Sequence, residues 1–573
     1  AFAADGFVVC EENVVCFRNR VGIKASHRTA TNYESKAPKT AYYLEGSSFE
    51  MGYLLGRLAE PEIDRMTEVF IDRVFLAMIR EAIYGERLDF MGSPGPKVLR
   101  IHGILVSLVR EMIRTCGVRA DVPGRFHREI RGIVAGCREA ARLGGRSTGV
   151  TEEELWVLNA GLDCVLSRTY TGVLLPSPLR PKDLRPPISC NGFALLNDAA
   201  ADGALFGRDF MFPTGGVFQE IAGHVVYNPI GEDEPMSLPF VSMTAPGIIG
   251  SIAAMNVSGV AAGVNMVVGG NCNPRRPGCN SLLLVRDCVE RGRRARDAVA
   301  RIVGARRGVT WNYLVVDGGG PRDRACVVEA GASMGRIPFT DYPGERLQPL
   351  LPDREFLEAH PSSEQARGTM MRWDTFRVPR EYLDFNDALW RRFGKTLRRE
   401  AFGPQGRINR EPVERNCPGG FYFAPERGRR GQLELATNHF VIPEMRMCSM
   451  HPWASRVSRA RLNDSQWRYD ELNRRILKAL DERGPIDVAT AKRLLSFLEP
   501  DGDYPDYYRL NPKSSDGRER LILGSTSLFD LRAKTVQSHH GYFADPWVGL
   551  QLSHYVDEYL EHGGFSSVSS KAW

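Results

Sequence analysis

The sequence predicts an α+β protein, in which a helical N-terminal part precedes a larger body of strands and helices. Apolar residues recur with helical spacing through most of residues 44–170. Short β-rich runs bounded by turn residues begin at Cys190 and return near the end of the chain. Blocks of strands and helices that follow one another are typical of an α+β or layered arrangement.

The N-terminal part is expected to be mostly helical and to end in a linker. Residues 1–43 are mixed and predict no clear element. Beyond them, helices are predicted over 62–83 and 123–143, and again after Thr151, which is followed by acidic residues typical of a first helical turn. Five prolines within residues 171–189 then predict an extended linker.

Glycines in the N-terminal part form a pattern that resembles a phosphate-binding loop only superficially. Gly46, Gly52 and Gly56 are not set in a strand–loop–helix unit, so close packing of a helix or turn is the better interpretation.

The body starts at Cys190 with hairpin-like strands separated by turn signals such as Asp202-Gly203. Two helices are expected next at about 280–304, followed by a strand pair at 311–331 and an insertion at 333–430. One strand at 433–440, helices at 465–497 and a last strand pair at 521–543 complete the order. We therefore divide the chain into an N-terminal segment, residues 1–189, and a body, residues 190–573.

Composition argues against several classes of protein. No run of eighteen apolar residues is present, which excludes a membrane span of the usual helical type. The net charge of +6 is spread along the chain without a nucleic-acid-binding motif, so a basic solvated surface is expected. Twelve cysteines lack zinc spacing, and the pair His539-His540 lacks a third ligand, so neither a metal nor an organic cofactor is predicted. The opening AFAADG resembles the remainder of a signal peptide and favours a secreted or periplasmic protein over a cytoplasmic one.

Cys190 is the residue around which chemistry can be assembled. It stands where the proline-rich linker meets the first strand, and a hairpin can bring Arg208 and Asp209 beside it. A neighbouring cation raises the thiolate fraction of a thiol. Asn256 in a Gly-rich hairpin and Asn438 at a strand end have amide groups that can stabilise an oxyanion. On these residues alone, a buried packing cysteine remains the more common alternative.

Several segments, in order, resemble the penicillin acyltransferase and choloylglycine hydrolase branch of the N-terminal-nucleophile hydrolases. CNGFALLNDAAADGALFGRDFMF, which starts at Cys190, is similar to the start of the catalytic chain in that branch. Four later segments also resemble that branch. Residues 247–266 are similar to its Gly-rich oxyanion hairpin and 311–330 to its central strand pair. Residues 436–440 resemble its Thr-Asn-His site, and 465–472 the start of its Ser-x-x-Arg-Tyr helix. Two upstream segments, 44–58 and 126–136, resemble the acyltransferase pro-segment.

The resemblance implies a four-layer αββα fold and a precursor that cuts itself between Ser189 and Cys190. Cys190 would then be the nucleophile and its freed α-amine the general base, with no cofactor. The resemblance also implies a role for four further residues. Arg208 would contact the thiol and the amine, and the side chain of Asn438 would donate to the oxyanion. Asn256 would donate to the oxyanion or orient the amine, and Arg468 would form ion pairs within the site.

One position departs from the family pattern Arg-Asn-x-Asp. Here it reads Arg208-Asp209-Phe210-Met211, so Met211 replaces the carboxylate, and Asp209 is the nearest substitute although strand neighbours face opposite sides.

The expected activity is hydrolysis or acyl transfer on a linear non-protein amide, with the 1–189 segment retained as partner after cleavage. A lipid amidase or phospholipase-B-like esterase and a catalytically silent binding protein remain as alternatives. Within the insertion, Trp373, Phe376 and Tyr382 are candidates for the acyl pocket. The acyl group, the balance of hydrolysis and transfer, disulfide pairing and oligomeric state are left open.

Overall fold

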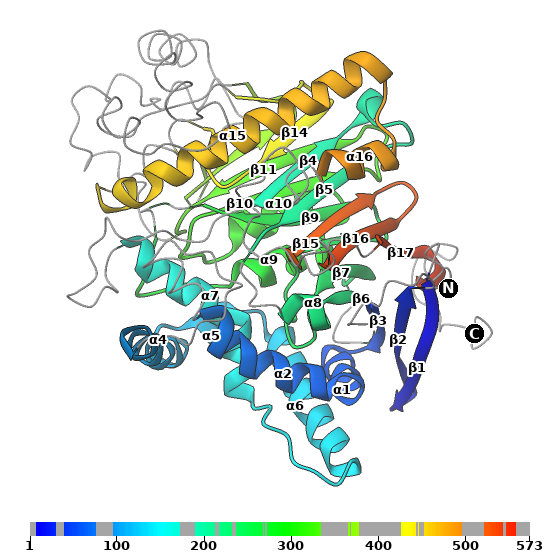
Figure 1. Cartoon of the computed structure of the whole chain (residues 1–573), viewed down its shortest axis with the longest axis vertical. Helices are drawn as coiled ribbons and strands as arrows, with labels where there is room; N and C mark the ends of the chain where they lie inside the picture. The colour runs from blue at the N-terminus through cyan, green and yellow to red at the C-terminus, as the bar shows by residue number, and fades with distance from the viewer. Residues whose placement is uncertain are drawn as a thin grey trace, which may run out of the picture.

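The computed structural model describes most of the chain as an assembly of two β-sheets and surrounding helices (Figure 1). The residues described are 7–29, 39–75, 96–171, 190–212, 217–231, 236–267, 269, 272–333, 365–366, 368–377, 426–442, 445, 452–495, 521–542 and 546–556. The α+β class is thereby confirmed. The linker from residue 172 onward, Ser189, Tyr382 and most of the predicted insertion lie outside these residues.

Sheet A has eleven strands in the order β1-β2-β3-β6-β7-β8-β9-β10-β11-β13-β12. All its neighbours are antiparallel except β3 and β6, which pair in parallel. The strands are Phe7–Phe17, Arg20–Thr29, Lys39–Gly46, Gly223–Pro229, Phe240–Thr244, Ala253–Asn256, Val260–Met266, Trp311–Asp317, Arg324–Ala330, Thr369–Trp373 and Gln365–Ala366 in that order.

Sheet B has six antiparallel strands in the order β14-β4-β5-β15-β16-β17. They are Leu433–Ala436, Cys190–Leu195, Leu205–Phe210, Leu521–Asp530, Thr535–Tyr542 and Val548–Gln551. The strands predicted from Cys190 onward and near residues 521–543 are thus present.

The two sheets pack face to face through side chains that alternate along each strand. Ala194 and Phe206 of sheet B share one buried cluster with Val241 and Leu314 of sheet A. Small residues permit the close approach: a Cβ on Gly263 of β9 would lie 2.8 Å from the Phe206 ring. This contact sets the spacing of the sheets beside the site described below.

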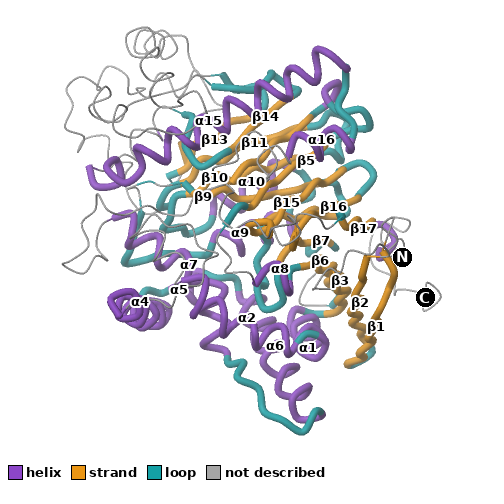
Figure 2. Tube along the Cα trace, viewed as in Figure 1, coloured by secondary structure: helices purple, strands orange, loops and turns teal. Residues whose placement is uncertain are grey.

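Helices cover the outer faces of both sheets (Figure 2). The outer face of sheet B packs on α15 (Pro452–Arg483) and α16 (Val488–Leu495). Tyr469, Leu472 and Leu494 of these helices form a second buried cluster with residues of that outer face. Sheet A packs on α9 (Ser281–Arg291) and α10 (Ala295–Gly304). The short helices η3 (Asn197–Ala199) and α8 (Val217–Ile221) lie in connections between strands of the body.

The N-terminal segment is built into this fold. Its helices gather in the lower part of Figure 1 and are α1 (Ser48–Leu58), α2 (Glu60–Val69), the π-helix η1 (Phe70–Val74), α4 (Pro96–Thr115), α5 (Val118–Asp121), α6 (Gly124–Leu143) and α7 (Glu152–Thr171). Strands β1 to β3 were not predicted. Through β3 the segment hydrogen-bonds directly to β6 of the body.

Glycines allow α1 and α6 to touch backbone to backbone, as the packing interpretation of the glycine pattern requires. A Cβ on Gly136 would lie 2.1 Å from the carbonyl oxygen of Tyr53, and one on Gly52 would lie 2.2 Å from that of Glu129. Neither separation is possible without moving a helix.

We expect Gly136→Ala to lower the free energy of unfolding by about 1–3 kcal/mol, because the added methyl group overpacks a backbone contact. Gly103→Ala is the matched control, since a methyl group added to that helical glycine of α4 would have no atom within 4 Å. The control should raise stability by up to ~1 kcal/mol through helix propensity. Urea denaturation of both variants measures the difference. Equal midpoints would contradict the packing role.

No helix among the described residues combines the length and apolar character needed to cross a bilayer.

Candidate active site

Cys190 is the first residue of β4, and side chains hold both of its backbone polar groups. Its N–H donates to Oδ1 of Asn438 at 2.7 Å, and its carbonyl oxygen accepts from Nη1 of Arg468 at 2.7 Å. Cys190 pairs with Phe210 of β5, so both side chains point to the face of sheet B that meets sheet A. The residue is 4% exposed.

The orientation of the Asn438 amide follows from its neighbours. Oδ1 meets two donors, the Cys190 N–H and Nη2 of Arg468 at 2.9 Å, whereas Nδ2 donates to the Met266 carbonyl at 2.7 Å. An amide oxygen alone can accept from both donors. The expectation that Asn438 directs its N–H at an oxyanion is therefore revised: its oxygen holds the Cys190 nitrogen, and an N–H is engaged by Met266.

Arg468, on α15, connects three parts of the site. Besides Cys190 and Asn438 it donates to Oδ1 of Asn191 at 2.7 Å, and its side chain is fully buried. These three acceptors are uncharged amide oxygens. The guanidinium fork fixes their relative positions.

Asp209 lies on the opposite face of sheet B from the Cys190 side chain. It accepts from Nδ2 of Asn191 at 3.1 Å and from the Thr526 hydroxyl at 3.2 Å. Met211 follows on the same outer face and packs in the core beneath α15 and α16. Asp209 is therefore connected to Cys190 through Asn191 and Arg468, and its carboxylate faces away from the thiol, where the missing carboxylate would lie.

Arg208 is brought to the expected face. It pairs with Gly192, two residues beyond Cys190, so its side chain enters the space between the sheets. One terminal nitrogen donates to the Asn191 carbonyl at 3.2 Å and the other to the Val264 carbonyl. Its Nε has no hydrogen-bond partner among the described residues.

Asn256 is not part of this cluster. Its Nδ2 donates to the carbonyls of Val289 and Gly292, and its Oδ1 accepts from the N–H of Ser258 and Val260. These bonds close the β8–β9 turn at the start of β9, whereas Asn438 contacts Met266 at the end of that strand. Six residues of strand separate the two places by about 20 Å. The proposed oxyanion or amine-orienting role of Asn256 is therefore wrong, because it is a turn residue.

Asn265, in the same hairpin, is the residue that sequence reasoning missed. It is fully buried, and neither of its amide atoms has a partner among the described residues. A Cβ on Gly192 would lie 3.7 Å from its Nδ2, which places the amide on the Cys190 side of β4. A buried amide without a partner is costly, so it marks a place where a bound molecule can supply the bonds.

The N-terminal segment also reaches this region, through Tyr170 at the end of α7. The Tyr170 hydroxyl is buried without a partner among the described residues. Burial raises the pKa of Tyr170 well above its ordinary value, and the nearby Cys272, Asp163 and Cys190 raise it further.

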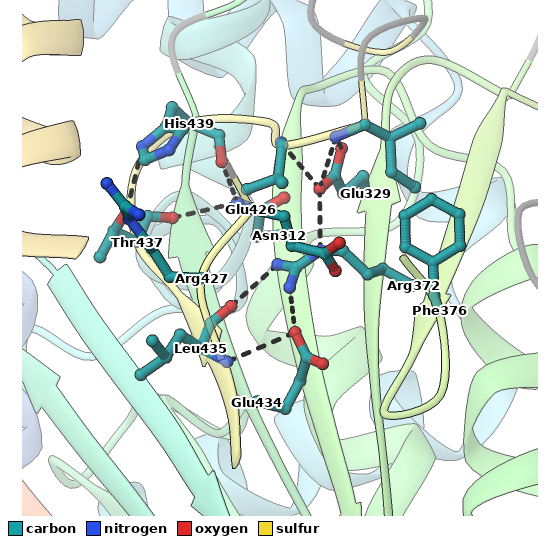
Figure 3. A network of polar contacts seen from close by, with 12 residues as sticks. Asn312, Glu329, Arg372, Phe376, Glu426, Arg427, Glu434, Leu435, Thr437 and His439 are labelled. Carbon is teal, nitrogen blue, oxygen red and sulfur yellow. Dashed lines mark hydrogen bonds and ion pairs between the residues drawn. The ribbon is translucent and has the colours of Figure 1, made fainter. Parts of the chain in front are cut away.

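The segment that carries Asn438 is tied to α15. His439 Nδ1 lies 2.7 Å from the Ser465 hydroxyl, which also accepts from the Asn438 N–H at 2.8 Å. Thr437 contacts both side chains, as Figure 3 shows for Thr437 and His439. His439 therefore has the structural role that its position suggested.

Several further side chains of the described residues can be placed. Among the described residues no group of three or more His, Cys, Asp or Glu side chains has the arrangement needed for a metal ion. The Cys272 and Cys279 thiols are free. Phe376 is buried in the core under α15, and Trp373 packs against the Arg324 guanidinium.

Comparison with known proteins gives distant similarities. No protein-family model matches the sequence. An uncharacterized protein of Archaeoglobus fulgidus is 28% identical over 517 residues, which are 90% of this chain and 66% of the relative, so the chain spans just under two thirds of that protein.

Among solved structures, an N-acylethanolamine-hydrolyzing acid amidase ortholog of Caenorhabditis elegans has a TM-score of 0.28 at 10% identity, covering 60% of this chain and 93% of the other. Two variants of conjugated bile acid hydrolase from Clostridium perfringens have TM-scores of 0.27 at 9% and 10% identity, covering 63% of this chain and 92% of each. At these TM-scores the similarities carry no argument about family or activity, and function must be argued from the residues around Cys190.

Proposed function

We propose that the chain is an autoprocessed cysteine hydrolase or acyltransferase of the N-terminal-nucleophile class, acting on a linear non-protein amide. The observation that carries the proposal is the hydrogen bond from the Cys190 nitrogen to Oδ1 of Asn438. The Cys190 nitrogen is buried and needs a hydrogen-bond partner, and the oxygen of a side-chain amide, which can also accept from a free amine, supplies it. After cleavage between Ser189 and Cys190 that nitrogen becomes a free α-amine beside its own thiol.

The stacked sheets with helices on both outer faces support the four-layer αββα arrangement of that class. Residues 1–189 would be the first chain and residues 190–573 the second. The parallel pairing of β3 with β6 supports the retention of the first chain as a partner.

In the reaction we infer, the α-amine takes the thiol proton while the sulfur attacks the substrate carbonyl carbon. An α-amine, with an ordinary pKa of about 7.7–8.0, can act as a base near neutral pH without a histidine. The tetrahedral intermediate then expels the amine leaving group, which receives the proton, and a thioester remains on Cys190. Water releases the acid, or an acceptor amine takes the acyl group.

The oxyanion needs donors on the Cys190 face between the sheets. Nδ2 of Asn265 and Nε of Arg208 are buried there without partners among the described residues. We assign them to the oxyanion in place of Asn256. Asn438 and Arg468 would hold the nucleophile, and we infer that they orient the amine where Met211 replaces the carboxylate.

Acylation of Cys190 tests the proposed function. Protein incubated with a panel of N-acyl amino acids, acylated amines and matching esters should release acid and should carry a thioester on Cys190 when quenched in acid. Asn265→Leu should keep the thiol but lose about 100–1000-fold in turnover, as expected for one oxyanion donor. Asn256→Leu is the contrasting variant, with losses in stability and not specifically in kcat. Turnover by a Cys190→Ala protein would refute the nucleophile, and hydrolysis of esters alone would favour the esterase alternative.

A further inference from the structure

A buried charge cluster joins the edges of the two sheets next to the site (Figure 3). Arg372 of β13 contacts the Glu434 carboxylate of β14, lies 3.4 Å through Nε from Oε1 of Glu329 in β11, and donates to the Leu435 carbonyl at 2.8 Å. All three charged side chains are at most 1% exposed. Sheet A thereby reaches the strand of sheet B that leads to Asn438.

Glu329 also holds the segment beyond Asn438. Its Oε1 accepts from the Val441 N–H at 2.9 Å, and its Oε2 accepts from the Ile442 N–H at 3.1 Å. On the near side, Nδ2 of Asn312 donates to the carbonyls of Thr437 and His439 at 3.0 and 2.8 Å. Sheet A therefore binds the site loop, residues 437–442, on both sides of Asn438. Figure 3 shows Asn312 and Glu329 beside this loop.

We propose that Arg372, Glu329 and Glu434 are positioning residues, whose charge balance keeps the site loop in place and so aligns the Cys190 amine through Asn438. The part of this inference that concerns catalysis rests on the proposed function. The part that concerns the loop does not.

The cluster has one guanidinium for two carboxyl groups, which makes its balance sensitive to pH. Burial raises the pKa of Glu434 to about 8 and that of Glu329 to about 7, although Arg372 acts against both shifts. Around them, Glu426 raises and Arg377 lowers the pKa of Glu434, while Tyr469 faces Arg372. One carboxyl group therefore keeps its proton near neutral pH.

Raising the pH past about 8 ionises both carboxyl groups and leaves an excess buried negative charge. Because the folded pKa values exceed the ordinary 4.5, the folded chain binds more protons than the unfolded chain between those limits, and stability falls as pH rises through that window. Raising the pH also deprotonates the α-amine, which should increase the rate. We therefore expect the charge cluster to cause the fall in kcat at high pH.

The experiment compares the wild type with Glu434→Gln, Arg372→Met and the control Arg324→Met. Glu434→Gln keeps an amide oxygen for Arg372 and removes the excess charge. Arg324 of β11 pairs with Asp374, the residue that follows β13, at 2.8 Å, and its side chain is 39% exposed. The readouts are the pH profile of kcat, and hydrogen exchange at the Val441 and Ile442 amides, which needs no substrate.

We expect kcat of the wild type to fall above pH of about 8, and Glu434→Gln to move that fall upward by at least about one pH unit. Arg372→Met should lower kcat about a hundredfold with little change in KM, and should speed exchange at both amides at least about tenfold relative to Arg324→Met. The proposal would be overturned if kcat of Glu434→Gln fell over the same pH range as that of the wild type. It would also be overturned if the Val441 and Ile442 amides exchanged no faster in Arg372→Met than in Arg324→Met. If Arg372→Met does not fold, Glu434→Gln still decides through its pH profile. If the wild type lacks amidase activity, the proposed function fails while exchange still decides the positioning role.

Discussion

Replacing Arg468 by Met is expected to abolish both self-cleavage and turnover. The change removes a fully buried guanidinium and leaves the Cys190 carbonyl oxygen and Oδ1 of Asn191 without that donor. Each buried group left unsatisfied costs about 1–3 kcal/mol. Loss of the Arg468 hydrogen bonds also lets Cys190 move relative to Asn438. A misplacement of about 1 Å costs on the order of a hundredfold in rate.

Gel analysis for cleavage and steady-state rates for turnover measure this effect. Arg468→Lys should recover folding better than activity, because an ammonium lacks the planar fork that meets three acceptors. Arg474→Met is the control on the same helix: Arg474 is 58% exposed and pairs with Glu471. Its effect should stay within ~0.5 kcal/mol of stability and leave rates unchanged. Equal rates in Arg468→Met and the control would remove Arg468 from the site.

The second large effect is expected at Arg286, which joins the N-terminal segment to the body. Arg286 of α9 makes a bidentate pair with Glu129 of α6 at 2.6 and 2.8 Å, and also contacts Glu290 and the Ile249 carbonyl. The three charged side chains are fully buried. Burial alone would raise the pKa of Glu290, but the guanidiniums of Arg125 and Arg286 hold it below its usual range.

Arg286→Met should therefore cost about 3–5 kcal/mol, since it takes the guanidinium from the buried Glu129 carboxylate and leaves Glu290 with Arg125 alone of the two. Arg276→Met is the matched control, because Arg276 also pairs with an acidic residue of the N-terminal segment, Asp121, but is 33% exposed. That control should cost at most ~1 kcal/mol. Urea midpoints and co-elution of the 1–189 and 190–573 chains measure the difference. A shift in Arg286→Met no larger than in the control would show that the buried pair does not hold the segments together.

Local sequence patterns predicted much of the body because its strands and helices carry their own signals. Turn residues and β-rich runs located β4, β5, β10 and β11. The alternation of strand residues explains why Asp209, the predicted substitute for the carboxylate, faces away from the thiol. The strands of residues 7–46 have no comparable signal, and β3 pairs with β6 across more than 170 residues of chain. Such pairing depends on tertiary packing and is absent from local sequence.

The site shows the same division. Arg208, Asn438 and Arg468 lie around Cys190 as the resemblance implied, yet the direction of the Asn438 amide depends on three partners distant in sequence. The sequence drew attention to Asn256 because its Gly-rich turn is conspicuous, and Asn265 was missed. Alternation along β9 held the missing signal: Ala261, Gly263 and Asn265 share the face toward sheet B, and a polar amide on that buried face needs a reason.

Intact-mass analysis of freshly purified protein tests the central claim most directly. We expect two masses, corresponding to residues 1–189 and 190–573, with Cys190 at the start of the second chain. Cys190→Ala should give the uncleaved mass alone, because the variant has no nucleophile for the Ser189 carbonyl. Wild-type protein that stays uncleaved while hydrolysing amides would contradict the account, since the Cys190 nitrogen would then still be an amide and could not act as the base.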